Sequence, residues 1–271
     1  MSVGRPAAAA ALVALAELAL CGPGTSGALP EGPAGAAAYT ATVPGSSVTF
    51  EMAPVPADGT APGFWIGRRE VTWAEYDVFR ADAQVKVQRA DEPAPGADAI
   101  TRPTPPYADE AFGFGKQGMP ALSITHHAAH EYARWLARRT GQAYRLPTEK
   151  EWERACQKGG DARAVTEGRA WVKDNAADKP HPVGAKPANA LGVFDMVGNV
   201  AEWVDTGSSA LYPQVAKGGS WMDEASASSC AARRVSDLSW NERDPQDPQS
   251  IWWQTDATFV GFRVVRSFEA K

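Results

Sequence analysis

The chain has 271 residues, of which 44% are hydrophobic, and this is enough for one domain with a substantial core. Its net charge of -5 gives no electrostatic support for a nucleic-acid partner. Ten tryptophans, 25 glycines and 21 prolines favour a loop-rich fold with irregular connections over a helix bundle.

The N-terminal segment has the pattern of a secretory signal. Residues 7–20 form an apolar run that follows a basic residue and is shorter than the roughly 20 residues needed to span a bilayer. We predict a signal peptide over residues 1–28, cleaved after Ala28, and therefore an exported protein, periplasmic or extracellular. No transmembrane segment is expected. Lipidation at Cys21 remains an alternative, although a bulky leucine directly before this cysteine argues against it.

The next segment predicts a linker followed by strands. Residues 29–42 are rich in glycine, alanine and proline, so we expect a flexible linker there and a single domain over residues 43–271. Apolar residues alternate with polar ones over 48–52, which is a strand pattern, and residues 64–67 form a second apolar run.

A first helix is expected after Thr72. Glu75 follows it by three residues, as in a capping box, and aromatic residues then recur at every third position. This spacing predicts a helix with one aromatic face. Residues 81–120 are rich in proline, alanine, aspartate and glycine, and we expect a long excursion with little regular structure.

Two further helices are predicted from their caps. Thr125 and Gly141 flank an apolar stripe over 126–139, which indicates a helix between them. Thr148 with Glu151 repeats the capping-box pattern, so a third helix is expected after residue 147. Beyond Gly159 the pattern indicates short strands and long loops.

Several short motifs occur in a fixed order along the chain. They are EVT at 70–72, RLPTE at 145–149, EWE at 151–153, DMVGNVAEW at 195–203, GGSW at 218–221, CAAR at 230–233 and GFR at 261–263. In this order and spacing they resemble the sulfatase-modifying-factor family, whose founder is the formylglycine-generating enzyme. The resemblance covers residues 43–267 and implies an α+β fold, a loop-rich variant of the C-type-lectin fold with little regular secondary structure.

The resemblance also implies an activity. Enzymes of this family oxidise a cysteine of a sulfatase peptide to formylglycine with O2 and one copper ion held by two thiolates. The first catalytic cysteine lies two positions after the aromatic of GGSW, where this chain has Asp223, and the second position falls on Ala225. Because a carboxylate is too hard a ligand to replace a thiolate on Cu(I), we predict neither copper nor formylglycine-generating activity.

Two cysteines remain if Cys21 leaves with the signal. In an oxidising compartment Cys156 and Cys230 are expected to be bonded. The resemblance implies the same bridge, because Cys230 opens the CAAR segment and Cys156 follows the EWE helix. The alternative is a free, reactive Cys230.

The resemblance further implies a structural calcium ion. Its ligands would be the side chains of Asp195 and Glu202 and the main-chain carbonyls of Gly198 and Val200. Oxygen donors closely spaced on an irregular loop suit Ca²⁺. The alternative is a Gly-Asn turn with solvated acids.

A histidine pair offers a second candidate metal site. His126 and His130 are four residues apart and share a helical face, so together they would be able to bind one metal ion. Helix capping and packing are the alternative explanation.

A ligand groove is the last candidate site. Its predicted lining comprises Trp221, Arg233, Arg234, Trp240, Trp252 and Trp253. Exposed tryptophans would stack on a peptide or a sugar, whereas packing in the core is the alternative for this residue type.

Taken together, these patterns predict an exported, calcium-stabilised domain that has lost the copper site. It would act as an accessory module that binds a peptide or a partner protein in the former active-site groove. The alternative is an oxidoreductase of the formylglycine-generating and non-haem iron superfamily that uses a divergent metal site in the same groove. The iron-dependent branch has a helical domain with an HxxxHxE pattern, which this sequence lacks.

Overall fold

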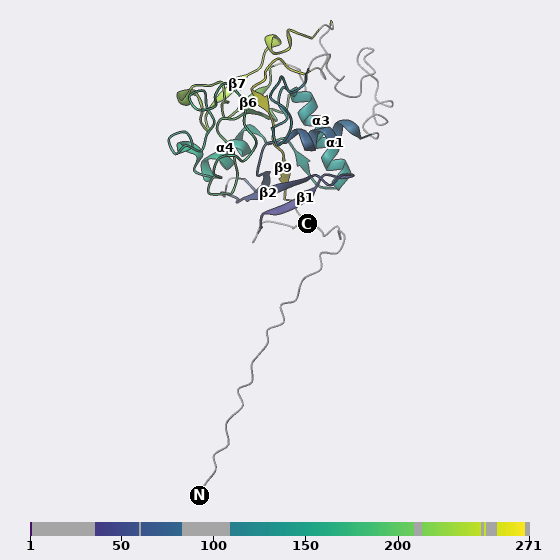
Figure 1. Cartoon of the computed structure of the whole chain (residues 1–271). Coiled ribbons are helices and arrows are strands. Elements are labelled where there is room, and N and C mark those ends of the chain that lie inside the picture. Colours follow the sequence, from purple (N-terminus) through teal and green to yellow (C-terminus); the bar gives the residue numbers. More distant parts are fainter. Residues whose placement is uncertain are drawn as a thin grey trace.

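The computed structural model describes residues 36–59, 61–82, 109–208, 213–244 and 254–268, together with Met1 and Asp247. In these residues, short strands and three α-helices are joined by long irregular segments (Figure 1). The α+β class predicted from the sequence is confirmed. The predicted signal segment, residues 1–28, lies outside the described residues apart from Met1.

The first sheet brings both ends of the domain together. Its strands are β1 (Tyr39–Thr42), β2 (Thr49–Val55), β3 (Phe64–Gly67), β4 (Tyr144–Arg145) and β9 (Val265–Ser267). They are antiparallel in the order β1-β2-β3-β9-β4. The last strand of the domain therefore lies between an early strand and a middle one.

The start of the domain lies earlier than the sequence predicted. Strand β1 falls inside the expected linker of residues 29–42 and pairs along its length with β2, with Tyr39 opposite Met52. The flexible-linker prediction is therefore wrong for residues 39–42. The reason is that backbone pairing with a neighbouring strand organises a segment whose own composition carries little strand signal.

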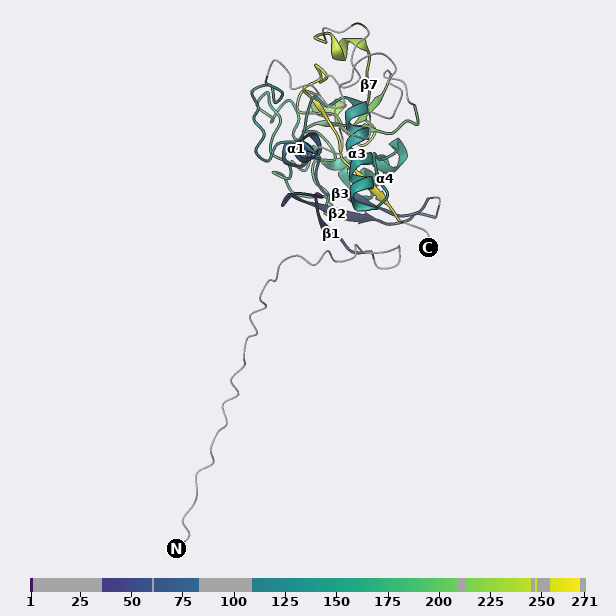
Figure 2. The same cartoon turned by 90° about the vertical axis from the view of Figure 1, so that its right-hand side faces the viewer.

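The second sheet lies toward the other end of the domain, where β6 and β7 are visible away from β1 and β2 in Figure 1, and β7 again in Figure 2. Its strands are β5 (Ala201–Val204), β6 (Val215–Lys217), β7 (Arg233–Val235) and β8 (Val260–Gly261). The order is β7-β6-β5-β8, and the β5–β8 pair is parallel. This sheet carries the GGSW and CAAR segments at its ends.

The helices begin and end where their caps predict. They are α1 (Trp73–Ala81), α3 (His126–Thr140) and α4 (Glu149–Lys158), and the short 3-10 helices are η1 (Asp161–Arg163), η2 (Ala225–Ala227) and η3 (Leu238–Asn241). Both predicted capping boxes are present, at Thr72 and at Thr148. Gly141 ends α3 in the left-handed conformation, with φ 67°, which a residue without a Cβ adopts freely.

Aromatic rings join α1 to α3. Tyr76 and Phe79 of α1 lie 6.0 and 5.7 Å from the ring of Tyr132, and Phe79 lies 5.5 Å from Trp135. Pairs of this kind add about 0.5–1.5 kcal/mol each beyond the area that they bury. The predicted aromatic face of α1 is therefore the surface that packs against α3.

Helix α4 is tied to the second sheet by a disulfide. Cys156, near the C-terminus of α4, is bonded to Cys230, just before β7, with a Cα–Cα distance of 5.6 Å. Both residues are buried. The bond encloses the DMVGNVAEW and GGSW segments and holds the CAAR segment against α4.

Replacing both cysteines by serine should lower the free energy of unfolding. The bond spans 74 positions, and closing a loop of that length in the unfolded chain accounts for about 4 kcal/mol. Urea denaturation of the oxidised wild type and of Cys156→Ser/Cys230→Ser would measure the loss. Equal stabilities would contradict a structural role for the bond.

Glu75 combines helix capping with burial. Its Oε1 accepts hydrogen bonds from the backbone N–H of Thr72 at 3.1 Å and from the Thr72 hydroxyl at 2.9 Å. Burial disfavours the carboxylate and raises the pKa of Glu75 to about 7. Because the unfolded chain ionises near 4.5, the stability that Glu75 contributes is complete below pH 4.5 and is lost as the pH rises through 7.

Glu75→Gln should remove this pH dependence while keeping an acceptor for the capping box. Relative to the wild type, the variant should gain stability between pH 4.5 and 7, by up to about 3 kcal/mol. Urea denaturation of both proteins at pH 5, 6, 7 and 8 measures the difference. A difference that stays constant over this range would show that Glu75 is not held protonated by the fold.

Candidate functional site

The GGSW segment is a tight backbone turn at the end of β6. Gly218 and Gly219 have φ angles of 97° and 76°, in the region that favours glycine. A Cβ on Gly219 would lie 2.6 Å from the hydroxyl oxygen of Ser228, and one on Gly218 would lie 2.8 Å from the carbonyl oxygen of Met196. Both glycines are therefore required by close packing, and they fix the direction of the residues that follow.

Asp223 stands at the first position that the resemblance assigns to a catalytic cysteine. The Ser220 hydroxyl donates to its Oδ2 at 2.6 Å, and the Arg234 guanidinium donates to its Oδ1. The backbone carbonyl of Asp223 accepts from the N–H of Lys173 at 3.0 Å. The carboxylate therefore links the turn to β7 by charge-assisted hydrogen bonds.

Ala225 stands at the second position and has no ligating atom. It begins η2 and packs, partly buried, against the core cluster that contains the disulfide. Among the described residues the two cysteines are bonded to each other. This region of the described chain therefore offers no thiolate pair to a soft metal ion.

Charged residues beside the turn are paired with one another. Lys217 is 1% exposed, and its Nζ lies 2.7 Å from Glu153 and 3.4 Å from Glu149. Arg233 donates from Nε to the same Glu149 at 3.0 Å. Helix α4 thus supplies the carboxylates that neutralise Lys217 of β6 and Arg233 of β7.

Two of the four predicted groove tryptophans belong to the core. Trp221 is 8% exposed, with its ring 5.7 Å from Phe114. Trp240 is 9% exposed and lies 5.1 Å from Phe259. Both residues therefore match the alternative in which these tryptophans pack in the core and do not line a groove. Trp252 and Trp253 lie outside the described residues.

Other apolar side chains near the turn are accessible. Met222, Val235 and Leu238 are 47%, 44% and 66% exposed. Val235 ends β7 and Leu238 begins η3, while Met222 precedes Asp223, which Arg234 of β7 binds. We call these three residues with Arg233 and Arg234 the β7 surface. Within β7 the side chains of Arg233 and Val235 are exposed, whereas Arg234 between them is half-buried and paired with Asp223.

The predicted calcium loop has an unusual backbone. Asp195 and Asn199 have φ angles of 55° and 53°, which are uncommon for residues with a Cβ. A Cβ on Gly198 would lie 2.2 Å from the carbonyl oxygen of Trp171, so only glycine fits there. The N–H of Asn199 donates to the same carbonyl at 2.8 Å, which fastens the loop to residue 171.

Asp195 has one oxygen that fits a cation. Its Oδ2 accepts from the N–H of Gly184 at 2.6 Å, whereas its Oδ1 is buried without a hydrogen-bond partner. Burial raises the pKa of Asp195 to about 6. An unpaired buried carboxylate oxygen is costly, and a bound cation would satisfy it.

Glu202, the other predicted carboxylate ligand, is already fully engaged. Arg263 donates from Nε to its Oε2 at 2.5 Å and from Nη2 to its Oε1, and Trp152 donates from Nε1 at 2.7 Å. The predicted calcium ligands therefore fit a cation only in part. Asp195 has an oxygen free to bind one, whereas both oxygens of Glu202 already bind the guanidinium of Arg263. No group of three or more histidine, cysteine, aspartate or glutamate side chains suited to a metal ion occurs within the described ranges.

Glu70 holds the same loop from the other side. Both of its carboxylate oxygens accept from Nδ2 of Asn199, at 3.1 and 3.2 Å, and Oε1 also accepts from the N–H of Val200. Burial, together with the charges of Asp195 and Glu202, raises the pKa of Glu70 well above its ordinary value. The EVT segment thus positions the loop 130 residues later.

His126 is a packed residue at the start of α3. It is 9% exposed, its Nε2 lies 3.1 Å from the carbonyl oxygen of Val204, and its ring meets Trp203 edge to face at 5.6 Å. Burial lowers its pKa to about 4, so the neutral ring donates to the carbonyl. His130 is 40% exposed on its side chain and lies beside Glu131. These contacts favour the packing alternative over a metal site.

Sequence reasoning missed Glu70 and Arg263 as members of the site. Both occur in quoted motifs, EVT and GFR, so the motifs themselves carried the signal. Their roles depend on partners far away in the sequence, since Arg263 reaches Glu202 and Glu70 reaches Asn199.

The comparisons with known proteins identify the family of this domain. A profile of the sulfatase-modifying factor enzyme 1-like domain matches residues 29–268. The chain is 34% identical over 119 residues to the formylglycine-generating enzyme of Mycobacterium tuberculosis, covering 37% of this chain and 38% of that protein. It is 30% identical over 148 residues to the inactive C-alpha-formylglycine-generating enzyme 2 of Bos taurus, covering 48% and 47%.

A third curated relative is the hercynine oxygenase of Mycolicibacterium thermoresistibile. It is 34% identical over 175 residues, covering 56% of this chain and 37% of the relative. The matched part thus spans less than half the length of each of these three curated proteins.

Among solved structures, Treponema denticola variable protein 1 matches with a TM-score of 0.58 at 20% sequence identity. The matched region covers 84% of this chain and 98% of the Treponema chain. At that identity the likeness concerns the fold alone.

Across the described part of the chain, no helix is both long and apolar enough to cross a membrane. With its motifs in order and a family profile matching nearly the whole chain, this protein belongs to the sulfatase-modifying factor (FGE-sulfatase) family.

Proposed function

We propose that this protein is a family member without copper-dependent formylglycine-generating activity and that it binds a peptide or a partner protein at the β7 surface. The single observation that carries the proposal is the state of Asp223. Its carboxylate is bound by Ser220 and Arg234, where the resemblance expects a thiolate ligand. A relative named inactive C-alpha-formylglycine-generating enzyme 2 supports the loss of activity within this family.

The β7 surface supports the binding role. Exposed Met222, Val235 and Leu238 are large apolar side chains, and exposed apolar groups of this kind are candidates for contact with a partner. Arg233 and Arg234 supply donors beside them, each already oriented by a carboxylate. The favoured ligand is therefore an extended segment that offers apolar side chains with a carboxylate next to them.

The binding role is tested with a displayed peptide library selected on the purified protein. Peptides enriched by the wild type should bind Met222→Asp/Leu238→Asp at least tenfold more weakly, because the variant places charges on the apolar contact area. Thr42→Asp, an exposed position on β1 in the first sheet, is the matched control and should bind like the wild type. Equal binding to the double variant and the wild type would rule out the β7 surface.

The loss of activity is tested with a cysteine-containing sulfatase peptide, Cu(I) and O2. A hydrazide probe should detect no aldehyde on the peptide, because the described residues near the turn supply no thiolate pair. Aldehyde formation, or stoichiometric copper or iron in the purified protein by plasma mass spectrometry, would favour the oxidoreductase alternative.

We also propose a structural calcium ion at Asp195, with the carbonyls of Gly198 and Val200 as further ligands. The buried, unpaired Oδ1 of Asp195 supports it. The ion pair with Arg263 argues against Glu202 as a ligand. The role of the ion would be to neutralise a carboxylate and to hold the loop, and it supplies no step of a reaction.

Removing calcium should lower the melting temperature of the wild type. With calcium at about 100 times its Kd, the loss should be about 5 °C or more. Asp195→Asn should respond to neither chelator nor calcium, while Glu242→Gln, an exposed carboxylate-to-amide control, should behave as the wild type. A wild type that is insensitive to chelator and contains no calcium by plasma mass spectrometry would refute the site.

Export is proposed on two grounds. The N-terminal pattern is that of a secretory signal, and the disulfide between Cys156 and Cys230 is of a kind that persists in oxidising compartments. Both agree with a periplasmic or extracellular protein.

A further inference from the structure

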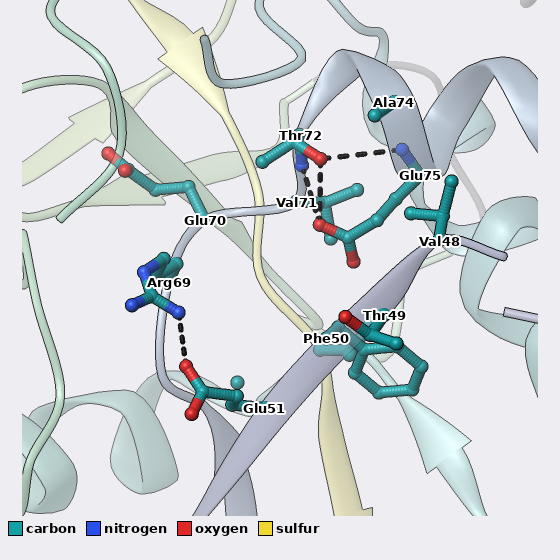
Figure 3. Close-up of a pocket in the computed structure, with 12 residues that line it drawn as sticks. Val48, Thr49, Phe50, Glu51, Arg69, Glu70, Val71, Thr72, Ala74 and Glu75 are labelled. Atoms are coloured by element: carbon teal, nitrogen blue, oxygen red, sulfur yellow. Dashed lines mark hydrogen bonds and ion pairs between the residues drawn. The ribbon is translucent and has the colours of Figure 1, made fainter. Parts of the chain in front are cut away.

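A cavity of about 160 Å³ lies between β2 and the start of α1. The side chains of Val48, Phe50, Val71 and Val264 contribute apolar walls, and Glu51, Arg69 and Glu75 contribute charged groups (Figure 3). The cavity belongs to the first sheet, at the end of the domain opposite the β7 surface (Figures 1 and 2). It is therefore separate from the β7 surface, and it adjoins the calcium loop only through Glu70, whose carboxylate binds Asn199.

One carboxylate oxygen in this cavity is unused. Glu75 is 7% exposed, and both hydrogen bonds that it accepts from Thr72 go to Oε1. In Figure 3 the other oxygen points from α1 toward Thr49 and Phe50, into the space between the helix and β2. Among the described residues, no donor is within hydrogen-bond distance of Oε2.

At pH 8, above the pKa of Glu75, the charges around the cavity leave one negative charge in excess. Glu51 is paired with Arg69, which lies across the cavity from Glu75, and with Arg68 at 2.9 Å. The carboxylate of Glu70 points away from the cavity (Figure 3) and binds Asn199. Among the side chains that line the cavity, the Glu51–Arg69 pair is therefore neutral, and Glu75, which becomes a carboxylate as the pH rises through about 7, has no ion pair of its own.

The volume exceeds what a single water molecule requires. A water needs about 10–15 Å³ of such space, and an engineered cavity of about 150 Å³ binds a molecule of the size of benzene. A purely apolar molecule would take Glu75 Oε2 out of water without offering it a donor, which is costly for an acceptor. The matching ligand therefore combines a donor of positive charge with a short apolar body.

We propose that this cavity binds a primary alkylammonium group, with the ammonium on Glu75 Oε2 and the alkyl chain against Val48, Phe50 and Val71. Two sources present this chemistry, a free small amine and the side chain of a lysine in a peptide. An ammonium has three N–H donors, and the hydroxyl of Thr49, which lines the same cavity (Figure 3), is a further acceptor for them.

The test is a titration of the full chain with n-butylammonium at pH 8, followed by amide chemical shifts in nuclear magnetic resonance spectra. Saturable shifts should appear in residues 48–51 and 69–75. Glu75→Gln, which removes the charge and keeps the capping acceptor, should weaken binding at least tenfold. Ala74→Leu should also weaken it, because it fills the cavity from a helix position that tolerates leucine.

Three controls complete the design. Glu224→Gln makes the same chemical change at an exposed acid paired with Lys173 and should bind like the wild type. n-Butanol, which has the same apolar body without the charge, should bind at least tenfold more weakly than n-butylammonium. Thermal melting of each variant confirms that it is folded.

A peptide with one central lysine between glycines distinguishes the two sources. Binding of this peptide at the same residues supports a lysine side chain as the ligand, and binding of n-butylammonium alone supports a free amine. Unsaturable shifts, or shifts unchanged in Glu75→Gln, would overturn the proposal. So would a crystal soaked with n-butylammonium that shows only water next to Glu75.

Discussion

The structure depends on one buried ion pair, between Arg263 and Glu202. Both side chains are 1% exposed or less, and Arg263 also donates to the carbonyl oxygens of Gly67 at 2.9 Å and Phe194 at 3.0 Å. Trp152 of α4 completes the set by donating to Glu202. Breaking such a pair by removing one partner costs about 3–5 kcal/mol, since the remaining charge is buried alone. This contact joins β3, β5, α4 and the loop before β5.

The same buried network connects the family motifs to one another. GFR supplies the guanidinium, AEW the carboxylate and EWE the indole donor, so three motifs far apart in sequence satisfy one buried network. Glu70 of EVT adds a fourth connection through Asn199. None of these contacts involves residue 223 or 225. The buried network therefore does not depend on Asp223 or Ala225, the residues at the positions that the resemblance assigns to catalytic cysteines.

The two ends of the domain offer different chemistry. At the second sheet, carboxylates of α4 and Asp223 hold the arginines of β7 beside exposed apolar side chains. At the first sheet, a capping glutamate keeps one oxygen turned into a cavity. At the cavity, a charged residue that supports the backbone also faces a space that a ligand is able to enter. A ligand bound at such a residue meets a side chain whose geometry is already fixed by its structural contacts.

Local features of this protein were determined by its sequence. Capping boxes at Thr72 and Thr148 and the glycine end of α3 were predictable because they join residues three or four positions apart. The motifs in order specified the family, and with it the fold.

The tertiary structure decided which carboxylates have partners. Glu202 is paired with Arg263 and Asp223 with Arg234, whereas one oxygen of Asp195 has no hydrogen-bond partner. It also buried Trp221 and Trp240, which sequence alone left open between groove and core. The physical reason is that desolvation and pairing depend on neighbours brought together across the chain, and no local pattern records them.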